Sequence, residues 1–347
     1  MKTINDIKMT PKLIGSFLLV GLIPLLIVGF LSINKADKSL MEQRFSALQS
    51  VQAIKSNQIQ AFFGERIGDA KVLADNPTTK MAILELDKAN MDAQENGLSG
   101  SGLLQDPTYR ETYDMYTKTF KYYMDTYGYY DIFLICPDDG NVLYTVTQEP
   151  DFGTILSREN TTLSKTWKET MRTGKAVLSD MEPYAPSAGV PAMFVACPVL
   201  DEGAVIGVIA MQISTEAIDN IMQERSGMGE TGECYLVGQD KKMRSNSFLD
   251  PDRHSIVASL KGSVEKNGVD TKAVQEAFAG NSGEEIITDY NGNLVLSAYC
   301  PVELSDELTW AVIAEIDLAE VEIPIKALQT SIIIICIVIG LVVAAFA

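Results

Sequence analysis

Three glycines, Gly227, Gly229 and Gly232, have the G-x-G-x-x-G spacing of a dinucleotide-binding loop. Such a loop needs a strand before it and a helix after it, so that helix amides face the pyrophosphate. Here the order is reversed, because "STEAIDNIMQER" (214–225) predicts a helix before the glycines and "ECYLVG" a strand after them. We expect a hinge instead: Gly227 suits the left-handed residue that closes a helix, and the other two let the chain turn.

Other chemistry is poorly supported. The only histidine, His254, lies in the polar stretch "DPDRHS", which predicts a surface loop, whereas imidazole metal sites and catalytic triads need a structured histidine. Carboxylate neighbours such as Asp138–Asp139 and Glu284–Glu285 fall in predicted turns or at a strand edge, where adjacent side chains point apart. "DPDRHSIVASLK" lacks the alternating acids and final glutamate of a Ca²⁺ loop. We expect no catalytic residue, no metal and no cofactor, and we interpret the chain as not an enzyme.

The cysteines predict no disulfide framework. There are five of them, an odd number, and none forms a C-x-x-C pair. A domain of this size does not need disulfides for stability, so we expect free thiols that are buried as small apolar groups. The five are Cys136, Cys197, Cys234, Cys300 and Cys336.

Composition excludes one class of partner. The chain has 347 residues, 46% of them hydrophobic, which is enough for about two domains. Acidic residues outnumber basic ones 46 to 28, giving a net charge of -18. Nucleic-acid phosphates need Lys/Arg-rich surfaces, so we expect no nucleic-acid partner.

Two apolar runs predict membrane helices. Residues 13–33 are 21 residues without a charge, long enough to span a bilayer. A cleaved signal peptide is the alternative, but the run is long for one and no A-x-A-like cleavage site follows it. Residues 331–347 are apolar on every face, as in a helix that contacts lipid. We expect the natural chain to continue beyond this second run, which is truncated here.

Charge predicts the orientation. Three lysines stand against one aspartate before the first run, although two lysines also follow it (Lys2, Lys8, Lys12 and Asp6; Lys35 and Lys38). The positive-inside rule therefore places residues 1–12 in the cytoplasm and residues 34–326 in the periplasm or outside the cell. This describes a two-pass protein of the cell (inner) membrane.

Between the runs, periodicity predicts helices first. Apolar residues at steps of three and four continue the first helix from Asn34 to Asn76, where "DNP" stops it. A rod of about 60 Å is too long for a globular helix, so we expect a stalk that packs on its own twin in a homodimer. In 107–127, six aromatic residues repeat at steps of three and four. We interpret this stripe as a packing surface, with a ligand-lining role as the alternative.

The rest of the chain is a tandem repeat. "IFLICPDDGNVLYTV" (132–146) matches "CYLVGQDKKMRSNS" (234–247) at an offset of 102 residues. "FVACPVLDEGAVIGVIAMQI" (194–213) matches "LSAYCPVELSDELTWAVIAEI" (296–316) at an offset of 103. Two matches at nearly one offset indicate a duplicated domain. Each copy reads as strands, a helix-rich insert and three more strands, an α+β module with an antiparallel sheet.

This organisation resembles the double Cache (dCache, tandem PAS-like) sensor region of bacterial transmembrane receptors. "IKMTPKLIGSFLLVGLIPLLIVGF" looks like methyl-accepting chemotaxis proteins, and "GETGECYLVGQDKKMRSNSF" resembles the opening of the family's membrane-proximal module. The resemblance implies an α+β fold in six parts along the chain. These are a cytoplasmic N-terminus (1–12), transmembrane helix 1 (13–33), a helical stalk and subdomain (34–127), a membrane-distal Cache module (128–225), a membrane-proximal Cache module (226–322) and transmembrane helix 2 (331–347).

The resemblance also implies a site in the distal module. The amino-acid-sensing branch carries R-x-W-Y, then Y-x-D, then an aspartate on the last strand. Laid on this chain, the pattern falls on Lys165, Trp167 and Lys168, then Tyr184 and Pro186, then Gln212. A lysine offers a point charge where arginine grips a carboxylate, and neither aspartate that would hold an α-ammonium is kept.

We therefore expect an anionic or neutral small-molecule ligand rather than an α-amino acid. Lys165, Trp167, Tyr184 and Gln212 are the predicted contacts, with Lys168 as a further candidate. Tyr144 and Phe194, on neighbouring predicted strands, are predicted pocket walls, with plain core packing as the alternative reading.

The resulting hypothesis is a small-molecule sensor of a chemoreceptor. The ligand, or a ligand-loaded binding protein, acts on the distal module, and transmembrane helix 2 carries the change inward. The resemblance implies that the missing cytoplasmic part couples to a chemotaxis kinase and adaptor. One alternative is the sensor region of a histidine kinase or nucleotide cyclase with the same outer architecture. A membrane-anchored extracellular enzyme is a second, disfavoured because no catalytic constellation is present.

Overall fold

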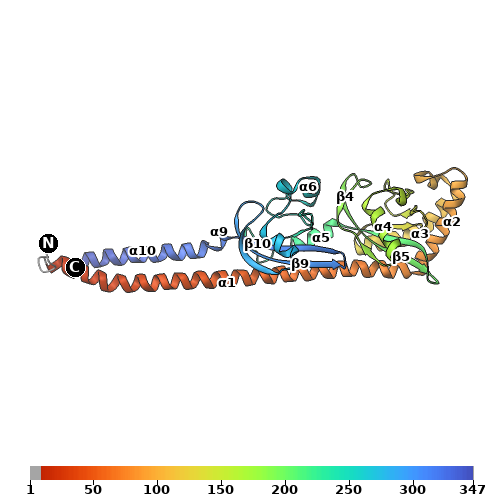
Figure 1. Ribbon diagram of the computed structural model, residues 1–347. Coiled ribbons are helices and arrows are strands. Elements are labelled where there is room, and N and C mark those ends of the chain that lie inside the picture. The colour runs from red at the N-terminus through yellow and green to blue at the C-terminus, as the bar shows by residue number, and fades with distance from the viewer. Residues whose placement is uncertain (1–8, 347) are drawn as a thin grey trace.

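A single helix runs the length of the molecule. The computed structural model describes residues 9–346, so the lysines and aspartate among the first eight residues lie outside it. Helix α1 (Met9–Asp75) is unbroken over 67 residues, with Pro24 inside it. Helix α10 (Ile323–Phe346) lies beside the N-terminal part of α1 (Figure 1). Both helices are long and apolar enough to cross a membrane.

Two antiparallel sheets sit along the other part of α1 (Figure 1). Between α1 and the first sheet come three helical segments: α2 (Pro77–Glu95), the short 3-10 helix η2 (Gly100–Gln105) and α3 (Pro107–Tyr127). The predicted α+β architecture is confirmed: a long N-terminal helix, two antiparallel sheets in tandem and a closing apolar helix.

The distal sheet has the strand order β2-β1-β6-β5-β3, with β4 pairing beside β5. Its strands are β1 (Tyr129–Ile135), β2 (Val142–Thr145), β3 (Val177–Leu178), β4 (Glu182–Tyr184), β5 (Val190–Asp201) and β6 (Ala204–Ile213). The helices of this copy are η3 (Leu156–Arg158), α4 (Thr162–Thr173) and α5 (Thr215–Met222).

The proximal sheet has the order β7-β10-β9-β8. Its strands are β7 (Glu233–Val237), β8 (Gly283–Thr288), β9 (Leu294–Ser305) and β10 (Leu308–Asp317). Its helices are α6 (Ile256–Lys261), α7 (Val264–Asn267), α8 (Lys272–Phe278) and α9 (Leu318–Val321), and α9 leads into α10.

The glycine hinge is built as expected except at its start. Helix α5 precedes the glycines and β7 follows them, which is the wrong order for a dinucleotide loop. Gly227 and Gly229 have positive φ angles of 82° and 77°. However, α5 ends at Met222 and its cap is Gln223, so Gly227 turns the connecting loop and does not close the helix.

Each face of the distal sheet packs on a different layer. Leu134, Val195 and Met211 belong to the core shared with α1, α2 and α3, whereas Phe133 and Phe194 belong to a separate cluster with α4. Four of the six aromatic residues in the stripe of α3 are buried in the first of these cores, Tyr123 packs partly buried against it, and Tyr127 is exposed. Tyr109, for example, donates its phenol to the Leu143 carbonyl. The packing interpretation of that stripe is confirmed. All five cysteines are free, and four are buried.

The predicted repeat recurs in individual hydrogen bonds. Asp131 at the start of β1 accepts the Val146 and Thr147 amides, at 2.8 and 3.3 Å. Glu233 at the start of β7 accepts the Phe248 and Leu249 amides at 2.9 and 3.3 Å. These partners are related by the same offset of 102 residues. A buried carboxyl therefore ties the first strand to the end of the following hairpin arm in both copies.

A buried ion pair joins the two modules. Asp180, between β3 and β4, receives two hydrogen bonds of 2.8 and 2.7 Å from the Arg244 guanidinium of the proximal module. The Trp310 indole of β10 donates to the same carboxylate at 2.9 Å. Asp240 lies 3.0 Å from Arg244 on its other side. We call the group of Asp180, Arg244 and Trp310 the intermodule clasp.

Replacing Asp180 with alanine should lower the free energy of unfolding by about 2–3 kcal/mol, because a guanidinium only 2% exposed then loses its bidentate partner. Asp240 remains and moderates the loss. The measurement is urea unfolding followed by circular dichroism. Asp306→Ala, at an exposed aspartate between β9 and β10 of the proximal module, is the matched control and should change stability by less than about 0.5 kcal/mol. Equal effects of the two variants would contradict a role for the clasp.

Candidate functional site

Four of the six predicted site residues share one face of the distal sheet. Trp167, Tyr184 and Phe194 are members of the cluster under α4. The Tyr184 and Phe194 rings meet edge to face with centroids 5.0 Å apart. Gln212 is opposite Phe194 in the pairing of β5 with β6, and so it projects from the same face.

Trp167 is held by helix α4. Thr161 caps the helix by accepting the Ser164 amide at 3.2 Å, and Gly174 ends it in the left-handed conformation with φ 64°. The indole is 6% exposed and covers Gly140, where an added Cβ would come within 3.1 Å of the ring. Its Nε1 is buried without a hydrogen-bond partner among residues 9–346. A buried indole donor usually finds an acceptor, so this atom is available to a ligand.

Tyr184 is bound to a carboxylate that the sequence did not suggest. Its phenol donates to Asp151 Oδ2 at 2.8 Å. Asp151 is buried, and this burial raises the pKa of its carboxyl to about 6, a rise that the Tyr184 hydrogen bond opposes. The other oxygen, Oδ1, accepts no hydrogen bond within the described part of the chain. One acceptor of a carboxylate that is ionised at neutral pH is therefore unused.

Gln212 lies beside Asp131 on this face of the sheet, and we call these two side chains, together with Asp151, the polar strip. Gln212 is opposite Asp131 in the pairing of β1 with β6 and is 4% exposed. Its Oε1 is the third buried polar atom on this face with no partner between residues 9 and 346. Burial also raises the pKa of the Asp131 carboxyl, although hydrogen bonds from Thr145 and Thr147 oppose the rise.

The two predicted cations are engaged elsewhere. Lys165 Nζ bonds both carboxylate oxygens of Glu182 at 3.0 and 2.7 Å, and its side chain is half exposed. Lys168 Nζ donates to the Glu159 carbonyl at 2.8 Å. Lys165 therefore stands at the surface as one half of an ion pair, and it brings no uncompensated positive charge to the sheet face.

Tyr144 is not brought together with the four residues that share the sheet face. It packs on the helical side of the sheet, with its ring 4.6 Å from Tyr113 and 5.3 Å from Phe120. The cause is an irregularity in the pairing of β1 with β2. Tyr144 is opposite Leu134, while Val142 is opposite Ile135, so one extra residue lies between them and reverses the face.

A cavity of about 300 Å³ opens beside the polar strip. Its lining comes from the loop after β2, from the start of α4 and from β4 with the turn that follows. Asp151 and Tyr184 form the buried part of this lining, and Pro186 is at its edge. The lining residues are Pro150, Asp151, Thr154, Leu156, Glu159, Thr161, Tyr184, Ala185 and Pro186.

Two acidic residues of this face, Asp131 and Asp151, were missed in the sequence. Asp131 carries a signal, because it and Glu233 stand two places before the aligned pair Phe133 and Tyr235. Asp151 carries none, since it lies in a loop and meets Tyr184 only through the fold. His254, predicted in a surface loop, is 4% exposed: its Nδ1 is 2.8 Å from Asp250 Oδ2 and its ring packs on Tyr290.

The family model described as "Cache domain" matches residues 34–325, most of the chain. The chain is a member of the Cache domain family. No curated protein matches it.

Solved structures share this Cache fold at low identity. The sensor domain of the Vibrio cholerae histidine kinase DctB is 14% identical, covers 78% of this chain and 97% of its own, and has a TM-score of 0.52. The ligand-binding domain of the Campylobacter jejuni chemoreceptor Tlp3, in complex with 4-methylisoleucine, is 13% identical, with coverages of 82% and 95% and a TM-score of 0.51. The ligand-binding domain of the Pseudomonas aeruginosa amino acid chemoreceptor PctC with GABA is 15% identical, with coverages of 79% and 99% and a TM-score of 0.49.

Replacing Asp151 with asparagine should change how the stability of this Cache protein depends on pH. The folded-state pKa of Asp151 is raised from 3.8 to about 6, so the native chain binds this proton more tightly than the unfolded chain. Ionising Asp151 therefore lowers the free energy of unfolding as pH rises from about 4 to 6, by up to about 3 kcal/mol.

Asparagine does not ionise, so the variant should gain stability relative to the unaltered chain between pH 4 and pH 7. Urea unfolding at several pH values measures the difference. Asp252→Asn, at an exposed loop position, is the control and should run parallel to the unaltered chain. A constant difference for Asp151→Asn over this pH range would show that Asp151 is not a buried acid.

Proposed function

We propose that this chain is the extracytoplasmic small-molecule sensing region of a transmembrane chemoreceptor, with its ligand in the distal module. The observation that carries the proposal is the set of three buried polar atoms on one sheet face. Asp151 Oδ1, Gln212 Oε1 and Trp167 Nε1 have no partner in the described residues. Buried polar atoms are rarely left unpaired, and a ligand that satisfied all three would bind with high specificity.

The ligand we infer is a hydrogen-bond donor or a cation, whereas the sequence suggested an anionic or neutral molecule. That expectation rested on Lys165 and on the absence of two aspartates. Lys165 is paired with Glu182, and Asp131 and Asp151 supply carboxyl groups from other elements. An ammonium group would satisfy Asp151 Oδ1 and Gln212 Oε1, and the Trp167 indole donor would suit a carboxylate or carbonyl on the same molecule.

Signal transfer follows from the connections between elements. The distal module contacts the proximal one through the intermodule clasp, and β10 of the proximal sheet leads through α9 into α10. A ligand that favours one conformation of the distal face would shift the populations of the conformational states of both modules through these contacts. We place the apolar ends of α1 and α10 in the cell membrane with the sheets outside, as a homodimer through α1.

The proposed sensor region would control a chemotaxis signalling domain. A fold shared with the sensor domain of a histidine kinase keeps a kinase, or a nucleotide cyclase, as the alternative output. The reading frame downstream of residue 347 decides between these, and a chemoreceptor would couple there to a chemotaxis kinase and adaptor. In an alternative mode of sensing, the distal module would bind a ligand-loaded binding protein rather than the small molecule itself. The second alternative function is a membrane-anchored extracellular enzyme, which turnover of a candidate ligand by the outer region would reveal.

Two tyrosines on opposite faces of one sheet test the ligand site. A thermal-shift screen of amines, amino acids and organic acids identifies a binder, which at a hundred times its Kd adds about 2.7 kcal/mol of stability. Tyr184→Phe removes the phenol that orients Asp151, and it should weaken that binder about fivefold to tenfold by calorimetry. Tyr144→Phe removes a phenol from the helical face and should leave the Kd unchanged within about twofold. Equal effects of the two variants would refute this placement of the site.

A further inference from the structure

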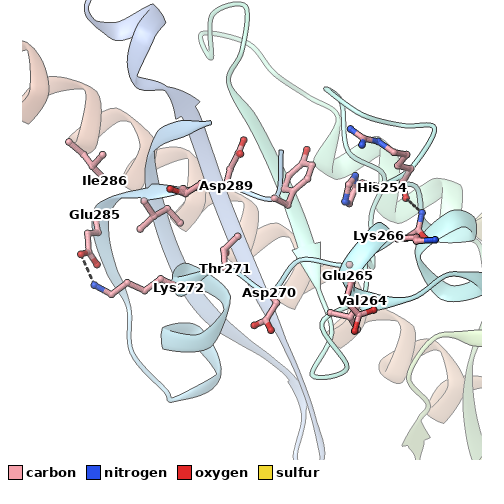
Figure 2. A pocket seen from close by; sticks show the side chains of 16 residues that line it. His254, Val264, Glu265, Lys266, Asp270, Thr271, Lys272, Glu285, Ile286 and Asp289 are labelled. Atoms are coloured by element: carbon pink, nitrogen blue, oxygen red, sulfur yellow. Dashed lines mark hydrogen bonds and ion pairs between the residues drawn. The ribbon is translucent and has the colours of Figure 1, made fainter. Parts of the chain in front are cut away.

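A second and larger cavity lies in the proximal module, outside the site described above. It measures about 1000 Å³ and opens between β8, α7, the start of α8 and the loop that carries His254 (Figure 2). Figure 2 shows Thr271 and Asp289 near its centre, with His254 to one side. The lining residues are Arg253, His254, residues 264–268, residues 270–272 and residues 285–290.

This cavity has the same place in the second copy as the 300 Å³ cavity has in the first. Thr161 and Thr271 both stand at the N-cap of the helix that covers the sheet. Tyr184 pairs with Val190 at the beginning of β5, the second-last strand of its module, and Asp289 bonds Asn293 just before the equivalent strand β9. In both copies the loop after the second hairpin arm forms another wall. The duplication therefore preserved a hollow at this position in both modules.

The buried part of the lining includes an unpartnered polar group. Thr271 is 7% exposed, and its Oγ1 has no hydrogen-bond partner in residues 9–346. A threonine at an N-cap normally accepts an amide of the first turn, but this one caps nothing. His254 Nδ1 bonds the Asp250 carboxylate, which places the ring proton there in the neutral form and leaves Nε2 as the acceptor.

The charge of the lining is unbalanced where it is buried. Lys272 pairs with Glu285 at 2.6 Å and Arg253 with Asp250 at 2.8 Å, while Asp270 is neutralised by Lys241 at 2.7 Å. Lys266 and Glu265 are exposed. Asp289 is 7% exposed and accepts the Asn291 and Asn293 amides, but no cation of the described chain pairs with it.

Further acids lie behind this wall. Glu315 on β10 is buried and accepts a hydrogen bond of 2.8 Å from the Tyr235 phenol. Its burial, together with the nearby charges of Asp289 and Glu233, raises the pKa of its carboxyl to about 8. Burial and the Asp289 charge also raise the pKa of the Asp317 carboxyl. A positive charge placed beside Asp289 would be favoured by the Asp289 carboxylate, and it would oppose the rise in the pKa of Glu315 and Asp317.

We propose that the proximal cavity is a second ligand site, which takes a small organic cation with a primary ammonium or amidinium group. The cationic group bonds the Asp289 carboxylate, the Thr271 hydroxyl and His254 Nε2, and its alkyl part packs on the Tyr290 ring. The site is independent of the distal one, since Asp151 and Tyr184 take no part in it.

The test uses the full chain in detergent with n-butylamine, 1,4-diaminobutane and butyramidine as probes, and butyrate as the matched anion. Calorimetry should show that at least one cationic probe binds the unaltered chain and the Asp151→Asn variant alike, and that butyrate does not bind. Asp289→Asn keeps an oxygen for the Asn291 and Asn293 amides but loses the charge, so it should weaken the bound probe tenfold or more, on the order expected for a charged hydrogen bond.

Two further variants make the result specific. Thr271→Val should weaken the same probe about threefold to tenfold. Asp270→Asn, at a lining aspartate already paired with Lys241, is the matched control and should change the affinity less than about twofold. The proposal is overturned if no cationic probe binds, if Asp289→Asn binds as the unaltered chain does while remaining folded by circular dichroism, or if only Asp151→Asn abolishes binding.

Discussion

Both sheets depend on one unbroken helix. Helix α1 has at one end a stretch that is long and apolar enough to cross a membrane, and beyond it a stripe of buried apolar residues against which the sheets pack. Ile59 and Phe63 are fully buried there, and the Phe63 ring meets Trp310 edge to face at 5.3 Å. Because Trp310 also donates to Asp180, the helix, the proximal sheet and the distal module meet at one indole. Movement of either module would therefore act on the other module and on helix α1.

The two copies show which parts of the module are structural. Asp131 and Glu233 make the same hydrogen bonds to the same hairpin positions, so their carboxyls hold the sheet and were kept in both copies. The residues opposite them on the last strand, Gln212 and Glu315, differ. One copy has a neutral amide where the other has a buried acid. The duplication kept the frame, while these two positions on the last strand diverged.

Periodic and local signals predicted most of the fold. Helix α1, the buried stripe of α3, the repeat and the free cysteines all follow from residue spacing that needs no knowledge of distant contacts. The site was less accessible to such reasoning. Tyr184 and Asp151 are 33 residues apart in the chain and meet only through the fold, as do Lys165 and Glu182. Tyr144 changed face because of a single extra residue in a hairpin, and His254 was buried although its sequence neighbours are polar.

The length of α1 has a consequence for what a cationic ligand would report. From Asn34 to Asp75 the helix rises about 60 Å, so the distal face stands far above the lipid headgroups in the proposed topology. Anionic lipids concentrate cations only within a layer of about one screening length, roughly 8 Å at physiological salt. The distal cavity lies well outside that layer. In the proposed topology, such a receptor would respond to the concentration of the cationic ligand in the surrounding fluid. Changes in lipid composition would not alter that response.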